Sequence, residues 1–181
     1  MAMTDIAVPE DLKNRTTLGP DELVACGWGY GYWAPYPRLP TGPLLLFDQV
    51  THFTFEGGDN GKGFVEATLD IHPDLWFFEH HFVGDPVMPG TLQKDVLYQL
   101  SGLALGLAGA RGKGRAKSSG DELFPAEVRP TAKLLRYRVD IEHMVVRPET
   151  SVIRTHGFAE VDGVRTCEAK AMKVRVFPLA A

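Results

Sequence analysis

Two residue types suited to proton transfer lie near the middle of the sequence. His81 precedes a short loop rich in proline and glycine, and Asp95 follows that loop. Imidazole exchanges protons near neutral pH, and a carboxyl group that is sheltered from water can keep its proton and act as an acid. The pair therefore predicts an elimination, in which one group removes a proton and the other assists a leaving hydroxyl.

A third residue, Gly90, lies between them at the predicted start of a helix. Pro86 and Pro89 stiffen the loop before it, because each proline fixes its own backbone and restrains the preceding residue. We expect Thr91 to cap the helix. Free N–H groups at a helix start attract negative charge, so a thioester carbonyl placed at Gly90 would be polarised toward an enolate. Glycine also lets a substrate approach the backbone closely.

The helix after Gly90 carries apolar residues at intervals of three and four. This spacing predicts one long helix that runs to about Leu107. The apolar stripe is broad, and small residues dilute the remaining surface, so the helix should be largely enclosed by other elements. The stripe comprises Leu92, Val96, Leu97, Leu100, Leu103, Ala104 and Leu107.

Strand patterns lie on both sides of this helix. An apolar run at 43–55 and a second at 62–71 resemble a hairpin, and a short helical turn is predicted within 74–82. Apolar and polar residues then alternate over 135–142, which indicates a half-buried strand. Two more strands, 152–161 and 164–177, flank the turn Asp162-Gly163.

The simplest arrangement of these elements is an α+β fold in which one antiparallel sheet wraps around the helix. Residues 1–42 contain many proline, glycine and aromatic residues without a sustained period, so we expect an irregular arm that packs on the domain, with one helical turn beginning at Pro20. Residues 43–181 form the expected domain.

Composition narrows the class of protein. The chain has 181 residues, 44% apolar and 23% charged, which is typical of one globular domain. No apolar stretch is long enough for a membrane span, and no secretory signal is evident, so we expect a cytoplasmic protein. Cys26 and Cys167 lack the spacing of a zinc site or a disulfide framework and are interpreted as ordinary thiols. We expect neither a metal nor another cofactor.

Charge is distributed unevenly along the chain. The net charge is −4, which disfavours nucleic acid as a general partner, yet residues 111–138 carry a net charge of +5 and the rest of the chain carries −9. A basic surface on an acidic protein suits an anionic partner. A solvated strand face explains the same pattern equally well.

The segment from His81 to Asp95 closely resembles the FabA-type 3-hydroxyacyl-[acyl-carrier-protein] dehydratases of bacterial fatty-acid synthesis. The resemblance rests on Asp74-Leu75-Trp76-Phe77-Phe78 and on His81-Phe82-x-Gly84-Asp85-Pro86-Val87-Met88-Pro89-Gly90, followed by Asp95. It extends over roughly residues 40–178 and includes Gly112-Lys113-Gly114-Arg115-Ala116 and Arg129-Pro130-Thr131-Ala132-Lys133. It implies a hot-dog fold, which agrees with a sheet wrapped around a helix.

The resemblance also implies roles for individual residues. His81 would act on the C2 proton, Asp95 would assist departure of the C3 hydroxyl, and the Gly90 N–H would hold the thioester oxygen. Val87, Phe82 and Trp76 are the other expected substrate contacts, although aromatic residues in such numbers are more often core. The implied partner is an acyl carrier protein, and the implied assembly is a homodimer whose active sites combine His81 of one subunit with Asp95 of the other.

Several positions depart from the family pattern. Glu79-His80 replaces Gly-Cys, Thr91-Leu92-Gln93-Lys94 replaces Cys-Leu-Gly-Leu, and Ser118-Ser119-Gly120-Asp121-Glu122-Leu123-Phe124 replaces a more apolar Gly-Val-Gly-Glu-Val-Lys-Phe segment. An ammonium group that reached Asp95 from Lys94 would weaken the acid, although adjacent helix residues do not face each other. These departures leave isomerisation and chain-length preference undetermined.

Three hypotheses follow for function. The leading one is a hydro-lyase that converts 3-hydroxyacyl thioesters to trans-2-enoyl thioesters, with or without isomerisation to the cis-3 form, in fatty-acid, polyunsaturated fatty-acid or polyketide synthesis. The second is a hot-dog acyl thioesterase. The third is a non-catalytic subunit that binds an acyl carrier. His80 and a purely helix-stabilising Asp95 are the alternatives at residue level, and the spacing to Gly84-Asp85-Pro86 favours His81 over His80.

Overall fold

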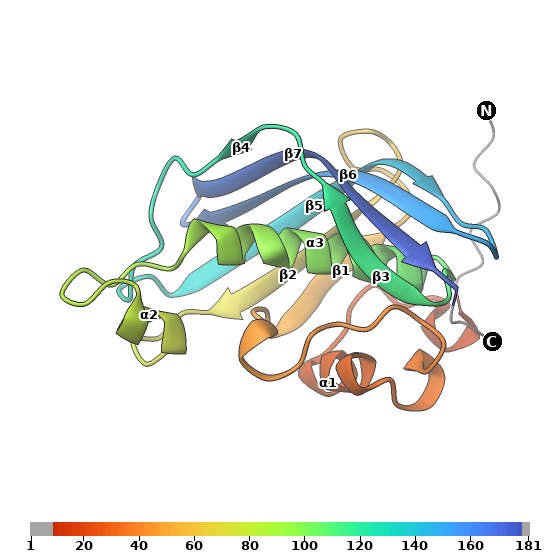
Figure 1. The fold of residues 1–181 in the computed structure, drawn as a ribbon, viewed down its shortest axis with the longest axis horizontal. Helices are drawn as coiled ribbons and strands as arrows, with labels where there is room; N and C mark the ends of the chain where they lie inside the picture. The colour runs from red at the N-terminus through yellow and green to blue at the C-terminus, as the bar shows by residue number, and fades with distance from the viewer. Residues whose placement is uncertain (1–8, 179–181) are drawn as a thin grey trace.

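The computed structural model describes residues 9–178, and its main feature is one curved sheet (Figure 1). All strand pairs are antiparallel, in the order β1-β2-β5-β6-β7-β3, and β4 pairs with β7 beside this path. The strands are β1 Gln49–Thr54, β2 Phe64–Asp70, β3 Lys113–Ser118, β4 Glu122–Leu123, β5 Leu134–Val145, β6 Ser151–Val161 and β7 Val164–Phe177.

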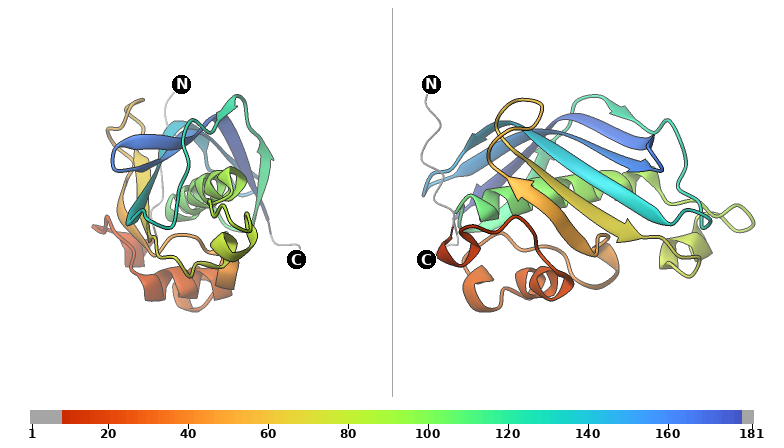
Figure 2. Two further views of the ribbon diagram at one scale, coloured as in Figure 1. Left: turned by 90° about the vertical axis from the view of Figure 1, so that its left-hand side faces the viewer. Right: turned by 180° about the vertical axis from the view of Figure 1, so that it is seen from behind.

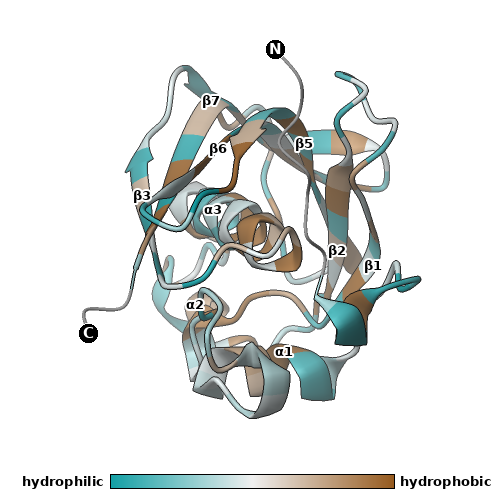
Figure 3. Cartoon of the chain, turned by 90° about the vertical axis from the view of Figure 1, so that its right-hand side faces the viewer, coloured by the Kyte–Doolittle hydropathy of each residue, from teal (hydrophilic) through white to brown (hydrophobic). Residues whose placement is uncertain are grey.

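The helix α3 (Gly90–Leu107) lies in the concave side of this sheet (Figure 3). Its apolar stripe from Val96 to Leu107 is buried because it faces the inward residues of the strands, as the alternation in β5 illustrates: Leu135, Tyr137, Val139 and Ile141 are all buried. The predicted sheet around an enclosed helix is therefore confirmed. A lone helix of this length would be marginal in water, so packing against the sheet supplies most of its stability.

An N-terminal arm covers the side of α3 that the sheet leaves open (Figure 2). Its elements are η1 Glu10–Leu12, α1 Pro20–Trp28, η2 Gly31–Trp33 and η3 Gly42–Leu44. Leu12, Leu18, Leu23 and Trp33 of this arm are buried in the common core. The helix at Pro20 begins where the sequence predicts and is longer than one turn. Glu22 accepts a hydrogen bond from the Gly19 N–H, 3.0 Å away, and so closes its first turn.

Some predicted boundaries were wrong. The expected strand at 43–55 begins only at Gln49, because residues 42–44 form the 3-10 helix η3. The helix α3 begins at Gly90 with Pro89 as its cap residue, two residues before the expected cap Thr91. The strands β3 and β4 were not predicted. Residues of β3 are exposed on both faces, so they show no apolar alternation.

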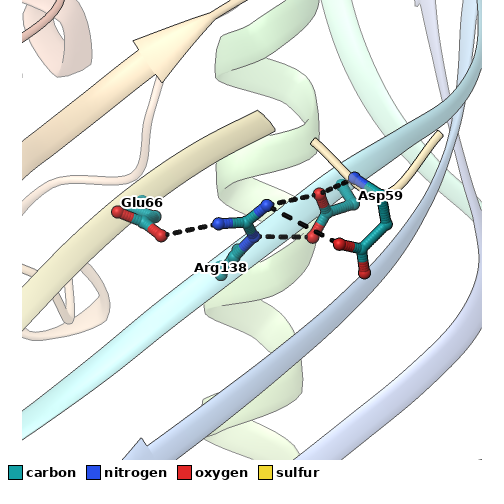
Figure 4. Close-up of polar contacts among 4 residues, drawn as sticks. Asp59, Glu66 and Arg138 are labelled. Atoms are coloured by element: carbon teal, nitrogen blue, oxygen red, sulfur yellow. Dashed lines mark hydrogen bonds and ion pairs between the residues drawn. The ribbon is translucent and has the colours of Figure 1, made fainter. Parts of the chain in front are cut away.

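The outer face of the sheet also holds a charge cluster around the buried Asp140, shown in Figure 4. Asp140 is only 1% exposed and accepts two hydrogen bonds from Arg138, at 2.7 and 2.8 Å, and one from the Asp59 N–H at 3.1 Å. Arg138 also donates to Glu66 at 2.9 Å. The cluster thereby ties the loop between β1 and β2 to β5.

Candidate functional site

The loop that follows the short helix α2 (Trp76–His80) is built as a tight turn. Phe82 and Asp85 exchange two backbone hydrogen bonds of 3.0 Å, and Gly84 between them has a φ of +80°, which glycine adopts without strain. The Val87 N–H then donates to the His81 carbonyl oxygen at 2.8 Å. These three backbone hydrogen bonds hold the loop in a fixed conformation beside His81.

His81 is held in one orientation by this loop. Its Nδ1 atom lies 3.0 Å from the carbonyl oxygen of Val87, and the ring of Phe82 stacks on the imidazole with centroids 3.8 Å apart. A carbonyl oxygen can only accept, so Nδ1 carries the hydrogen. In the neutral ring Nε2 then has a free lone pair, which is the form required of a base. His80, by contrast, is exposed.

Asp95 lies in the second turn of α3 on a face that is exposed in the single chain. Its Oδ2 atom accepts a hydrogen bond of 2.7 Å from Nε2 of Gln99, one turn further along the helix. The same Gln99 nitrogen donates to the carbonyl oxygen of Leu44 at 2.9 Å. Gln99 was not predicted as a site residue, although its spacing of four from Asp95 was a usable signal.

The turn η3 contacts both elements that carry the predicted catalytic residues. Besides the Leu44 carbonyl, which accepts from Gln99, the Pro43 carbonyl accepts a hydrogen bond of 3.0 Å from the indole of Trp76. Trp76 begins the helix that leads to His81, whereas Gln99 contacts Asp95. Two consecutive carbonyl groups therefore fix the elements that carry both predicted catalytic residues. These elements lie at the same end of the molecule (Figure 1).

Gly90 is the first residue of α3, so its N–H has no acceptor within the helix. The ring of Phe124 lies directly against its Cα, and a Cβ added to Gly90 would overlap that ring. Any other residue at this position would therefore require the Phe124 ring to move. Phe124 was not singled out from the sequence.

The other expected substrate contacts differ in exposure. Phe82 is 56% exposed and Trp76 is 38% exposed, whereas Val87 is buried and contributes its carbonyl to His81. Val83, at the tip of the turn, is 94% exposed. Large apolar side chains thus lie open to solvent around His81.

The unusual polar residues of α3 have partners away from Asp95. Lys94 forms an ion pair of 2.7 Å with Glu122, and Gln93 accepts a hydrogen bond of 2.7 Å from Thr166 on β7. The ammonium group of Lys94 therefore pairs with Glu122 on β4 and not with Asp95. Glu79 is exposed, like His80 beside it.

The basic segment 111–138 divides into two kinds of residue. Arg129 pairs with Asp85 and Glu127, and Arg138 belongs to the charge cluster around Asp140. Within residues 9–178, no ion pair involves the exposed cations on or next to β3, which are Arg111, Lys113, Arg115 and Lys117. Lys133 and Arg136 on or next to β5 also form no ion pair within residues 9–178, so four of the six unpaired cations of the segment lie at that edge of the sheet.

Other chemistries find little support in the described part of the chain. Burial raises the pKa of both Cys26 and Cys167 to about 12, so neither thiol is a nucleophile near neutral pH. Over residues 9–178, His, Cys, Asp and Glu form no group of three or more suited to a metal ion.

The same residues include no helix with the length and hydropathy needed to cross a bilayer.

A long helix enclosed by an antiparallel sheet is the arrangement of a hot-dog fold. The chain belongs to the FabA-like domain family, whose match covers residues 39–170. The resemblance seen in the sequence is thereby confirmed. Residues 9–38, which include α1, lie outside the matched range.

Solved structures with the same fold include enzymes of two activities. A chain of the dehydratase heterocomplex ApeI:P from Xenorhabdus doucetiae has 14% identity and a TM-score of 0.52, covering 77% of this chain and 86% of that chain. A mutant thioesterase from Pseudomonas aeruginosa has 14% identity and a TM-score of 0.53, covering 90% of this chain and 96% of that chain. At these identities the likeness shows the fold alone, so the reaction must be argued from the site.

Proposed function

We propose that this protein dehydrates 3-hydroxyacyl thioesters to trans-2-enoyl thioesters. The observation that carries the proposal is the hydrogen bond between His81 Nδ1 and the Val87 carbonyl, which leaves Nε2 as a base. Dehydration needs such a base at C2, a donor for the thioester oxygen and an acid at C3. Gly90 and Asp95 supply the donor and the acid.

The proposed reaction removes one proton and one hydroxyl. The thioester oxygen accepts a hydrogen bond from the Gly90 N–H, which stabilises negative charge on that oxygen. Nε2 of His81 takes a proton from C2, and the electron pair of the C–H bond forms the C2–C3 double bond. The C3–O bond breaks as the protonated Asp95 gives its proton to the departing hydroxyl, which leaves as water.

We further propose that the working unit is a homodimer. Asp95 is exposed in the single chain, whereas a carboxyl group acts as an acid near neutral pH only where it is sheltered from water. Phe82 and Val83 also expose apolar surface beside His81. A second subunit over this surface would shelter both, with His81 and Asp95 of each site supplied by different subunits.

The proposed substrate carrier is an acyl carrier protein with a phosphopantetheine arm, in the cytoplasm. The support for this part is the concentration of Arg111, Lys113, Arg115 and Lys117 at one edge of the sheet, which suits an acidic partner. Affinity between such surfaces falls as salt is added. An affinity that does not change with salt would contradict this part of the proposal.

The experiment that tests the function compares two products. Purified protein is incubated with 3-hydroxyacyl thioesters of several chain lengths, and both enoyl absorbance and free thiol are followed. Enoyl formation without thiol release supports the dehydratase, and release of thiol from the same substrates supports the thioesterase. Neither product from any substrate, while a known dehydratase succeeds in parallel, would favour the non-catalytic subunit. The cis-3 isomer is measured in the same samples.

A further inference from the structure

We call the segment from Ser118 to Phe124 the strap. It runs from the end of β3 along the edge of β7 with which β3 and β4 both pair. Its backbone is attached to β7, since the Gly120 N–H donates to the Lys170 carbonyl at 2.7 Å and the Lys170 N–H donates to the Asp121 backbone carbonyl at 3.0 Å. The two residues of β4 continue this pairing. The strap therefore has a fixed side, toward the sheet, and a side turned toward the start of α3.

A single ion pair attaches the strap to α3. The Nζ atom of Lys94 lies 2.7 Å from Oε1 of Glu122, and Ser119 donates a hydrogen bond to the same oxygen. The two side chains are 22% and 29% exposed, so water and salt screen them less than a fully exposed pair. The hydrogen bond from Lys94 is the largest cause of a lowered pKa of the Glu122 carboxyl.

The strap ends at the thioester site proposed above. Phe124, two residues beyond Glu122, places its ring against Gly90, and 45% of Phe124 is exposed. Its ring therefore covers the side of Gly90 on which a Cβ would lie. Lys94 and Glu122 both stand where the family pattern quoted above has apolar residues.

We propose that Lys94 and Glu122 are positioning residues, whose ion pair holds the strap so that Phe124 forms one wall of the thioester site at Gly90. This inference rests on the proposed function, because Gly90 is a substrate site only if the protein binds acyl thioesters. The pair acts through Phe124 and touches no reacting atom. Its loss should weaken substrate binding and leave the chemical step unchanged.

The kinetic test uses neutral 3-hydroxyacyl pantetheine thioesters, because an uncharged substrate removes any effect of carrier-protein charge. Lys94→Leu and Glu122→Gln should raise KM by about three- to fivefold, the range expected for one partly exposed ion pair, with kcat unchanged. Lys94→Arg keeps the pair and should keep the wild-type KM. The matched control is Arg154→Gln, which breaks a pair of 2.7 Å with Glu142 elsewhere on the protein and should alter neither constant.

A second measurement is independent of activity. Hydrogen–deuterium exchange of peptides covering 118–124 should be faster in Lys94→Leu and Glu122→Gln, and unchanged in Lys94→Arg and Arg154→Gln. Thermal unfolding by circular dichroism confirms that each variant is folded.

The outcomes separate the claims. Unchanged exchange in the strap would show that the ion pair does not hold it, and faster exchange with an unchanged KM would show that the strap is not a wall of the site. Either result overturns the inference. If the wild type converts no thioester, the proposed function fails and the claim about KM fails with it, while the exchange data still decide whether the pair fixes the strap.

Discussion

His81 Nδ1 and the Val87 carbonyl oxygen are 3.0 Å apart, and this contact leaves Nε2 of the imidazole as the available base. We predict that His81→Ala lowers kcat for dehydration by about 10²- to 10⁴-fold, the usual contribution of a general base. His80→Ala is the matched control, because His80 is the exposed neighbour. The measurement is the initial rate of enoyl formation, and an equal loss in both variants would argue against His81 as the base.

Gln99 is predicted to orient Asp95. Gln99→Leu keeps a similar side-chain size but removes the hydrogen bonds to Asp95 and to the Leu44 carbonyl. We expect kcat to fall by up to about tenfold, the upper end of the usual contribution of one hydrogen bond, with little change in KM. Gln49→Leu is the control, because Gln49 on β1 contacts Thr68 and lies outside the site. Wild-type kcat in Gln99→Leu would show that Asp95 needs no such support.

The sequence predicted the layers of the fold because they depend on local periods. The spacing of apolar residues in α3 and the alternation in β5 follow directly from which faces are buried. The strand β3 lacked this signal, since it is an exposed edge strand with basic residues. The 3-10 helix at Gly42–Leu44 was missed for a different reason: its carbonyl groups are held by Trp76 and Gln99, which are distant in sequence.

In the candidate site too, features with a local sequence pattern could be predicted, and features that depend on contacts between distant segments could not. His81, Gly90 and Asp95 could be named because their types and spacing form a recognisable pattern. The contact of Phe124 with Gly90 and the ion pair between Lys94 and Glu122 could not, because both depend on how β4 returns to α3. Asp140 was expected on the polar face of its strand and is nevertheless buried, since the loop containing Asp59 folds over it.

The proposed dimer makes a prediction about mixtures. His81→Ala and Asp95→Asn should each be inactive as pure proteins. When the two are mixed and their subunits exchange, about a quarter of all sites should recover both residues, if each site draws them from different subunits of a two-fold dimer. The measurement is enoyl formation before and after exchange. No recovery, with exchange demonstrated by mass spectrometry, would show that each chain supplies its own pair.

The charge cluster around Asp140 predicts how stability depends on pH. Burial raises the pKa of this carboxyl, but the hydrogen bonds from Arg138 and the Asp59 N–H outweigh burial, so the pKa is lowered overall. The unfolded chain therefore binds this proton more readily than the folded one. Stabilisation by Asp140 is complete above the ordinary pKa of about 3.9 and is lost as the pH falls through the lower folded value.

Asp140→Asn should accordingly lower the free energy of unfolding by about 2 kcal/mol at neutral pH, because it weakens the charge-assisted hydrogen bonds between Arg138 and a buried carboxylate. The difference from wild type should shrink as the pH is lowered below about 3.9. Denaturant unfolding at several pH values measures this. Asp162→Asn, in an exposed turn that also tolerates asparagine, is the control and should change little. A difference that stays constant with pH would show that the charge of Asp140 is not the cause.

The central claim is that His81 removes a proton from C2 of an intact acyl thioester. The most direct test is mass spectrometry of a 3-hydroxyacyl thioester that carries two deuterium atoms at C2, incubated with wild type and with His81→Ala. Wild type should give an enoyl thioester that retains one deuterium, and His81→Ala should give almost none. A free acid that retains both deuterium atoms, or the same enoyl product at the same rate from His81→Ala, would contradict the claim.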